Sequence, residues 1–88
     1  MIARRLTVHG RVQGVFFRDW TIENARELGV AGWVRNEADG SVAAHLEGDE
    51  AAVEAMIARM AAGPPAARVE GIERVEAQPE RLAGFRRR

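Results

Sequence analysis

Residues 10–18 read Gly10-Arg11-Val12-Gln13-Gly14-Val15-Phe16-Phe17-Arg18. They separate a segment of alternating apolar and polar residues from a segment with helical periodicity, so we predict a loop that leads from a strand into a helix. Gly10 and Gly14 tolerate positive φ, and a loop of this kind turns several backbone N–H groups toward one point. The helix N-terminus that follows and the guanidinium of Arg18 add further donors. The stretch therefore predicts an anion site, and a phosphate fits it best.

Periodicity on either side of this loop predicts the remaining elements. Leu6 and Val8 alternate with polar residues as in a half-buried strand, and Asp39-Gly40 is a strong signal for a hairpin turn. Apolar residues spaced by three around Gly71 indicate a bulge in a late strand. The predicted strands are residues 4–9, 30–36, 42–47, about 67–78 and a short strand at Phe85, and the predicted helices are residues 17–28 and a segment from Gly48-Asp49 to Gly63.

The second predicted helix carries an apolar stripe that faces a sheet. Val53, Met56, Ile57 and Met60 occupy positions i, i+3, i+4 and i+7. The order β-α-β-β-α-β predicts an α+β fold, a ferredoxin-like split βαβ sandwich with two helices on one face of a mostly antiparallel sheet. In this topology the first two strands run parallel with the third between them, so the loop and Asn36 lie at the same edge.

Composition places the chain among soluble globular proteins. Hydrophobic residues make up 47% and charged residues 30% of the 88 residues, which is enough for one domain over residues 1–88. No apolar run is long enough to cross a membrane, and no apolar signal core follows Met1. We therefore expect a cytoplasmic protein with no membrane partner.

Cysteine is absent, which excludes disulfides, a thiol nucleophile and zinc thiolate sites. The 13 basic and 13 acidic residues cancel, which argues against nucleic acid as a partner because counterion release needs a cationic surface. His9 and His45 are isolated on the polar side of strands, where we expect both to be solvated. We expect no metal and no cofactor.

Two motifs resemble those of one family. GRVQGVFFR, together with Gly32-Trp33-Val34-Arg35-Asn36, resembles the acylphosphatase pattern G-x-V-Q-G-V-x-F-R followed by G-W-V-x-N, and the resemblance spans essentially the whole chain. It implies metal-free hydrolysis of the carboxyl–phosphate bond of a small acyl phosphate. It also implies that Arg18 binds and stabilises the phosphoryl oxygens, that Asn36 orients the attacking water, and that residues 10–17 cradle the phosphate.

The residue types fit such a reaction. An amide oxygen accepts a hydrogen bond from water but takes no proton, so Asn36 can position water without acting as a general base. Acyl phosphates already have a good carboxylate leaving group, and positioning plus charge stabilisation could suffice for them. The sequence departs from the family at Phe16, a variable loop position, and in Gly84-Phe85-Arg86-Arg87-Arg88, where the family more usually ends in an aromatic residue.

Other interpretations of the same residues stay open. The domain could be a non-catalytic anion-binding module, or an RNA-binding domain, although the predicted strands 4–9 and 42–47 offer no aromatic residue for stacking. Asn36 alone would usually be a strand-end residue, and Glu23 and Glu27 are typical of a solvated helix face. We expect Trp33 to serve sheet packing near the site, Arg86 to Arg88 to form a solvated tail, and the chain to be a monomer because no apolar face is left over.

Overall fold

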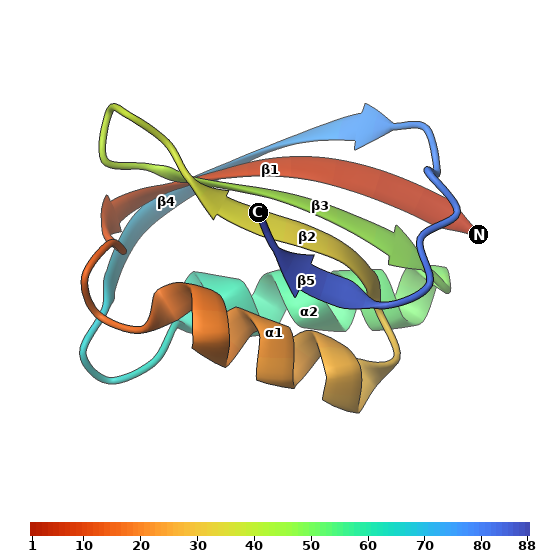
Figure 1. The fold of residues 1–88 in the computed structure, drawn as a ribbon, viewed down its shortest axis with the longest axis horizontal. Coiled ribbons are helices and arrows are strands. Elements are labelled where there is room, and N and C mark those ends of the chain that lie inside the picture. The colour runs from red at the N-terminus through yellow and green to blue at the C-terminus, as the bar shows by residue number, and fades with distance from the viewer.

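The computed structural model describes residues 1–88, and its elements follow the predicted order, including the short strand at the end (Figure 1). They are β1 (Ile2–Arg11), α1 (Phe17–Leu28), β2 (Ala31–Asn36), β3 (Val42–Gly48), α2 (Glu50–Ala62), β4 (Arg68–Ala77) and β5 (Phe85–Arg87). β1 extends beyond its predicted end because Gly10 and Arg11 continue to pair with β4. The loop predicted over residues 10–18 is therefore shorter, and residues 12–16 connect β1 to α1.

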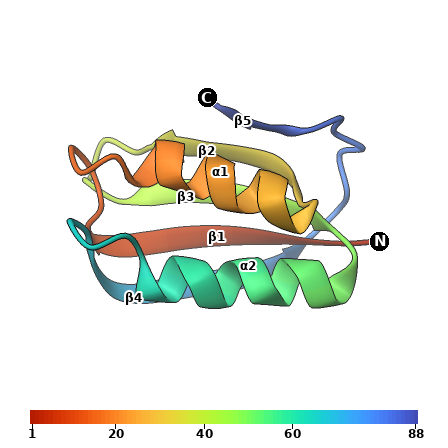
Figure 2. The same cartoon turned by 90° about the horizontal axis from the view of Figure 1, so that it is seen from below.

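The strands form one sheet in the order β4-β1-β3-β2-β5. β3 pairs antiparallel with both β1 and β2, and β1 also pairs antiparallel with β4. Only β5 runs parallel to its neighbour, β2. Both helices cover the same face of the sheet (Figure 2), which we term the inner face. The predicted ferredoxin-like α+β sandwich, with β3 between the parallel β1 and β2, is confirmed.

The inner face carries the hydrophobic core. Alternate residues of the central strands point toward the helices, and the predicted stripe of α2 packs against them fully buried. Neither helix has the length and apolar composition that a membrane-crossing helix needs. The principal core residues are Leu6, Val8, Val12, Phe17, Ala25, Val34, Val42, Ala44, Leu46, Val53, Met56, Ile57, Met60 and Phe85.

The predicted bulge lies where β4 meets the end of β1. His9 pairs with Gly71, but Gly10 pairs with Val69, so Glu70 is the extra residue on β4. At Gly10 (φ 125°) a Cβ atom would come within 2.0 Å of the carbonyl oxygen of Arg68. Gly10 therefore allows the close approach of the two backbones at the point where the chain leaves the sheet.

An irregular segment, residues 78–84, connects β4 to β5 and thus joins the two edges of the sheet (Figure 1). We term this segment the strap. The backbone N–H groups of Glu80 and Leu82 donate to the two carboxylate oxygens of Glu47, at 2.7 and 2.9 Å. The strap is thereby anchored to β3 on the outer face of the sheet, which the helices leave uncovered.

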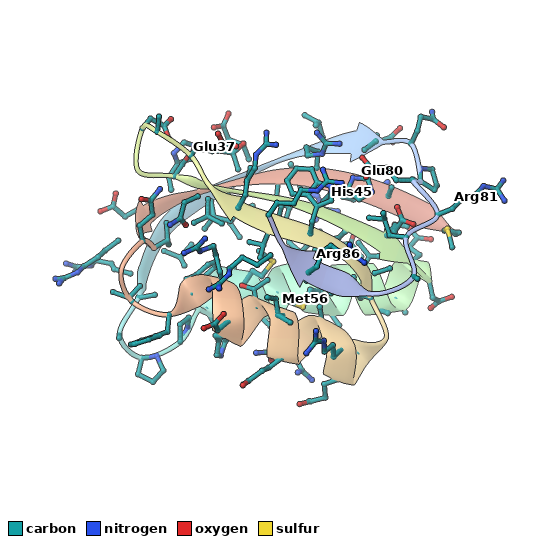
Figure 3. The ribbon with its side chains drawn as sticks, viewed as in Figure 1. Glu37, His45, Met56, Glu80, Arg81 and Arg86 are labelled. Atoms are coloured by element: carbon teal, nitrogen blue, oxygen red, sulfur yellow. The ribbon has the colours of Figure 1, made fainter.

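The prediction that His45 is solvated is wrong. Its side chain is fully buried on the outer face, and its Nε2 lies 2.8 Å from Glu47 Oε1. Figure 3 shows His45 and Glu80 on one side of the sheet and Met56 on the other. Burial alone would raise the pKa of Glu47, but the N–H groups of Glu80 and Leu82 and the His45 imidazole together hold the pKa below its ordinary value.

Trp33 also lies on this outer face, beneath three guanidinium groups. Those of Arg5, Arg35 and Arg88 lie 4.9, 4.9 and 4.6 Å from the centre of its ring. The indole N–H donates to the Glu80 carboxylate at 3.3 Å. Trp33 therefore packs against the sheet as predicted, but on the face opposite to the core and not near the predicted site, and it offers no exposed aromatic surface for stacking a base.

Candidate active site

The loop of residues 12–16 is held in place from two directions. Val12 and Val15 are buried in the core, which fixes the loop from within. The Gln13 side-chain amide donates to the carbonyl oxygens of Glu37 and Ser41, both at 2.8 Å, which ties the loop to the β2–β3 turn. The loop is thus held by the core on one side and by the turn between β2 and β3 on the other.

Left-handed residues shape the entry into α1. Gly14 has φ 75°, and Phe16, the N-cap residue of α1, has φ 61°. A non-glycine residue in this region is uncommon, and here it directs the chain sharply into the helix. The first backbone N–H groups of α1 are therefore presented at the end of the loop, where the positive end of the helix dipole favours an anion.

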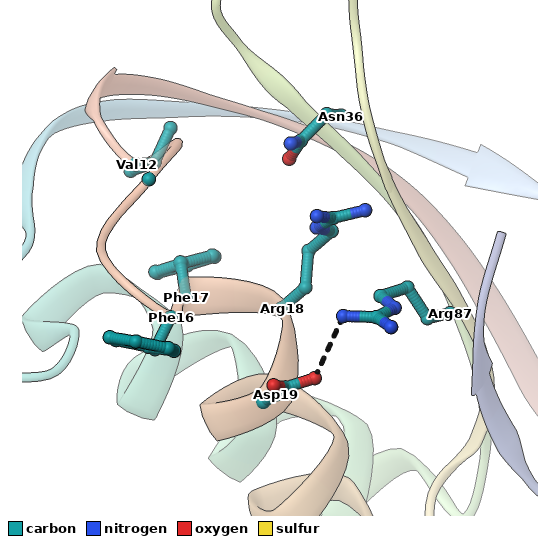
Figure 4. A pocket seen from close by; sticks show the side chains of 8 residues that line it. Val12, Phe16, Phe17, Arg18, Asp19, Asn36 and Arg87 are labelled. Atoms are coloured by element: carbon teal, nitrogen blue, oxygen red, sulfur yellow. Dashed lines mark hydrogen bonds and ion pairs between the residues drawn. The ribbon is translucent and has the colours of Figure 1, made fainter.

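A pocket of about 290 Å³ opens beside this helix N-terminus (Figure 4). It brings together Arg18 and Asn36, the two side chains predicted to form the site. Of the predicted phosphate cradle, Gly10, Arg11, Gln13 and Val15 do not line the pocket: the first two belong to β1, and the others anchor the loop. The pocket is lined by Val12, Gly14, Phe16, Phe17, Arg18, Asp19, Asn36 and Arg87.

Arg18 and Asn36 reach the pocket from opposite walls. Arg18 lies in the first turn of α1 and takes part in no salt bridge of the structure. Asn36 ends β2, and it shares the inner face with Val34 because side chains two residues apart point the same way. In Figure 4 the guanidinium of Arg18 points toward the Asn36 amide. A charged donor and a neutral amide thus face the same space.

Arg87 is a pocket residue that the sequence analysis missed. It belongs to β5 and not to a solvated tail, and it pairs with Val34 of β2, so its side chain shares the inner face with Asn36. Its Nη1 lies 3.2 Å from Oδ1 of Asp19. One pattern in the sequence could have indicated this position. Side chains two residues apart on a strand point to the same face, and Arg87 is two residues after Phe85, the expected anchor of this strand.

The other candidate residues lie away from the pocket. His9 is half exposed on the outer face and pairs with Glu73, and Glu27 pairs with Arg59 at 2.8 Å. His, Asp and Glu side chains form no group of three or more that could hold a metal ion. The charged groups at the pocket are thus two guanidiniums and the Asp19 carboxylate, a balance that favours an anionic ligand.

Comparison with known sequences identifies close relatives. The family model described as Acylphosphatase matches residues 4–87. An acylphosphatase of Rhizorhabdus wittichii is 58% identical over 85 residues, which are 96% of this chain and 85% of the relative. An acylphosphatase of Acidiphilium cryptum is 49% identical over 88 residues, which cover this chain entirely and 97% of the relative.

A solved structure shares the same architecture. The crystal structure of acylphosphatase from Bacillus subtilis superposes with a TM-score of 0.94 at 36% sequence identity. The match covers 98% of this chain and 97% of the other. The two folds therefore agree over almost the whole of both molecules.

Proposed function

The chain belongs to the acylphosphatase family and is a hydrolase that acts on acyl phosphates, and we propose that the pocket at the start of α1 is its active site. In this proposal the backbone N–H groups of the loop and the guanidinium of Arg18 hold the phosphoryl group, and Asn36 orients the attacking water. The reaction yields a carboxylate and inorganic phosphate, without a metal or other cofactor.

Arg18 carries the electrostatic part of the proposed mechanism. Its planar guanidinium can donate to two phosphoryl oxygens at once, and no carboxylate of the structure forms an ion pair with it. The N-terminus of α1 adds N–H donors and a positive dipole end beside it. The N–H groups of the helix are fixed before the substrate binds, so they can stabilise the charge on the phosphoryl oxygens in the transition state without reorganising.

In the proposed mechanism, Asn36 positions the attacking water. Its amide oxygen can accept a hydrogen bond from a water molecule and aim the water at phosphorus, opposite the departing carboxylate. The carboxylate leaves as an anion and needs no general acid. Water positioning therefore completes the chemistry that Arg18 and the loop begin.

One observation carries the proposal: Arg18 and Asn36, which belong to motifs far apart in the sequence, line the same pocket at a helix N-terminus. Arg18→Ala should lose both turnover and phosphate affinity. Asn36→Ala should lose about 10²-fold or more in kcat while its inhibition by inorganic phosphate stays unchanged. Hydrolysis of benzoyl phosphate in the presence of a chelator measures both, and the exposed Arg86→Ala variant is the control.

Two outcomes would contradict this mechanism. If Asn36→Ala left kcat unchanged, the residue would not position the water. If a chelator abolished hydrolysis by the wild-type protein, the reaction would depend on a metal ion. A monomeric state and a cytoplasmic location stay predictions, and size-exclusion chromatography tests the first.

A further inference from the structure

We infer that Arg87 is a second substrate-binding residue, one that contacts the acyl part of the substrate and favours acyl phosphates whose acyl group bears a carboxylate. This inference rests on the proposed function, because it takes the phosphoryl group to lie against Arg18 and the loop. It names a substrate class for the site and a residue that selects it.

The register of the sheet explains why Arg87 reaches the pocket. β5 pairs with β2 at only three positions, with Arg87 opposite Val34. The backbone N–H of Arg88 donates to the carbonyl oxygen of Val34 at 2.8 Å, which fixes the end of this strand. Phe85 is buried on the same face. The position of Arg87 is thus set by the sheet and by a core side chain, and not by a free chain end.

The neighbouring arginines do not share this environment. Arg88 lies on the outer face, stacked over Trp33 and 3.8 Å from a Glu80 carboxylate oxygen. Arg86 is exposed and pairs in register with Trp33, so it also points away from the core. Of the three consecutive arginines, only Arg87 lines the pocket.

Arg87 lies on the far side of Arg18 from the loop. The loop follows β1, and β5 is the third strand away from β1 in the sheet. At the usual spacing between strands, β1 and β5 are roughly 14 Å apart. In Figure 4 the guanidinium of Arg18 lies between Val12 of the loop and Arg87. When the loop cradles a phosphoryl group against Arg18, the acyl part of the substrate can therefore extend past Arg18 to Arg87.

The Arg87 guanidinium keeps donors free for a ligand. Its ion pair with Asp19 uses one N–H, and a guanidinium has five. About half of the side chain is exposed, and the remaining edge can bind a carboxylate with two parallel hydrogen bonds. Asp19 holds the side chain at the pocket and thereby lowers the entropy lost when a ligand binds. A carboxylate on the acyl group is the complementary partner.

The test compares acetyl phosphate with succinyl phosphate, whose acyl group is longer by a methylene and a terminal carboxylate. Arg87→Ala should lower kcat/KM for succinyl phosphate by about 10-fold, mainly through KM, and leave acetyl phosphate within about 2-fold. The matched control, Arg86→Ala, should leave the ratio of the two substrates unchanged. Arg87→Lys keeps the charge and should retain part of the preference, and urea denaturation shows whether each variant is folded.

Three results would overturn the inference. An equal loss for both substrates, with weaker inhibition by inorganic phosphate, would place Arg87 on the phosphoryl group. An unchanged ratio in folded Arg87→Ala would show that the residue serves only the ion pair with Asp19. Equal use of the two substrates by the wild-type protein would exclude the preference itself. Acetyl phosphate hydrolysis by wild type, and its loss in Asn36→Ala, test the proposed function separately.

Discussion

Leu46 and Glu47 are neighbours on β3, and both side chains are wholly buried, but on opposite faces of the sheet. Leu46 packs beneath two helices, among apolar side chains that repeat with the periods of strands and helices. Glu47 lies beneath the strap, among hydrogen-bond donors from Glu80, Leu82 and His45. The two faces thus achieve the same burial by different means.

A helix and an irregular segment need different partners when they cover a face of a sheet. Regular helices satisfy their own backbone groups, so they can cover a strand with apolar side chains alone. An irregular segment has unpaired backbone N–H groups, and burying them needs an acceptor from elsewhere. Glu47 supplies two acceptor oxygens to the strap, and the strap and His45 in turn compensate the cost of burying its charge.

Truncating a core side chain on the inner face should cause the largest loss in the free energy of unfolding. Leu46→Ala removes buried methyl groups and leaves a cavity that the neighbouring side chains fill only in part. We expect a loss of about 3 kcal/mol in the free energy of unfolding. Urea denaturation measures this loss, and a change below about 1 kcal/mol would mean that the core around β3 is loosely packed.

Glu47→Gln should produce a smaller change on the outer face. Glutamine keeps the shape of the side chain but replaces one acceptor oxygen by an amide donor, so one N–H of the strap loses its partner. We expect a loss of about 2 kcal/mol at neutral pH. If Glu47→Gln proved as stable as the wild-type protein, the strap would not depend on this carboxylate.

Acidic pH should reduce the contribution of the outer face to the free energy of unfolding, but not that of the inner face. Because the folded state lowers the pKa of Glu47 below its ordinary 4.5, its ionisation stabilises the fold above that pH, and this stabilisation is lost as the pH falls through the folded-state value. The difference between wild type and Glu47→Gln should therefore shrink below pH 4.5, whereas the Leu46→Ala difference should not. Denaturation curves at neutral and acidic pH give both comparisons.

An exposed ion pair should show the smallest effect. Arg74 and Glu54 join β4 to α2, with side chains 40% and 44% exposed. Water solvates both groups in the unfolded state and largely in the folded state, so removing the pair should cost little. Glu54→Gln should be indistinguishable from wild type by urea denaturation, and a change as large as that of Glu47→Gln would contradict the contrast between buried and exposed carboxylates.

The same contrast explains which parts of the molecule the sequence could predict. Leu46 and Met56 follow strand and helix periods, so the order of the elements and the inner core were predictable. His45 and Glu47 have the composition of a solvated face, and the path of the strap, together with the Trp33 ring, buries them. That path has no periodic signal, because the strap is irregular.

The candidate site shows the same division. Arg18 and Asn36 lie in two motifs with recognisable spacing, and the sandwich topology places both at one edge. Arg87 enters through a strand that pairs with β2 at only three positions, and neither its neighbour nor its register can be predicted from such a short segment. The structure therefore adds Arg87 to the predicted site, and this is the pocket residue most distant in sequence from the loop.

The order of the strands has a consequence for association between copies of the chain. β4 and β5 form the edges of the sheet, where unpaired backbone groups could add a strand from another molecule. β4 carries Arg68 and Arg74 as well as Glu70, Glu73 and Glu76, whereas β5 is only three residues long and carries Arg86 and Arg87. Two copies that aligned β5 with β5 would bring arginines together, so charge repulsion and the short length of this strand both oppose its pairing with itself.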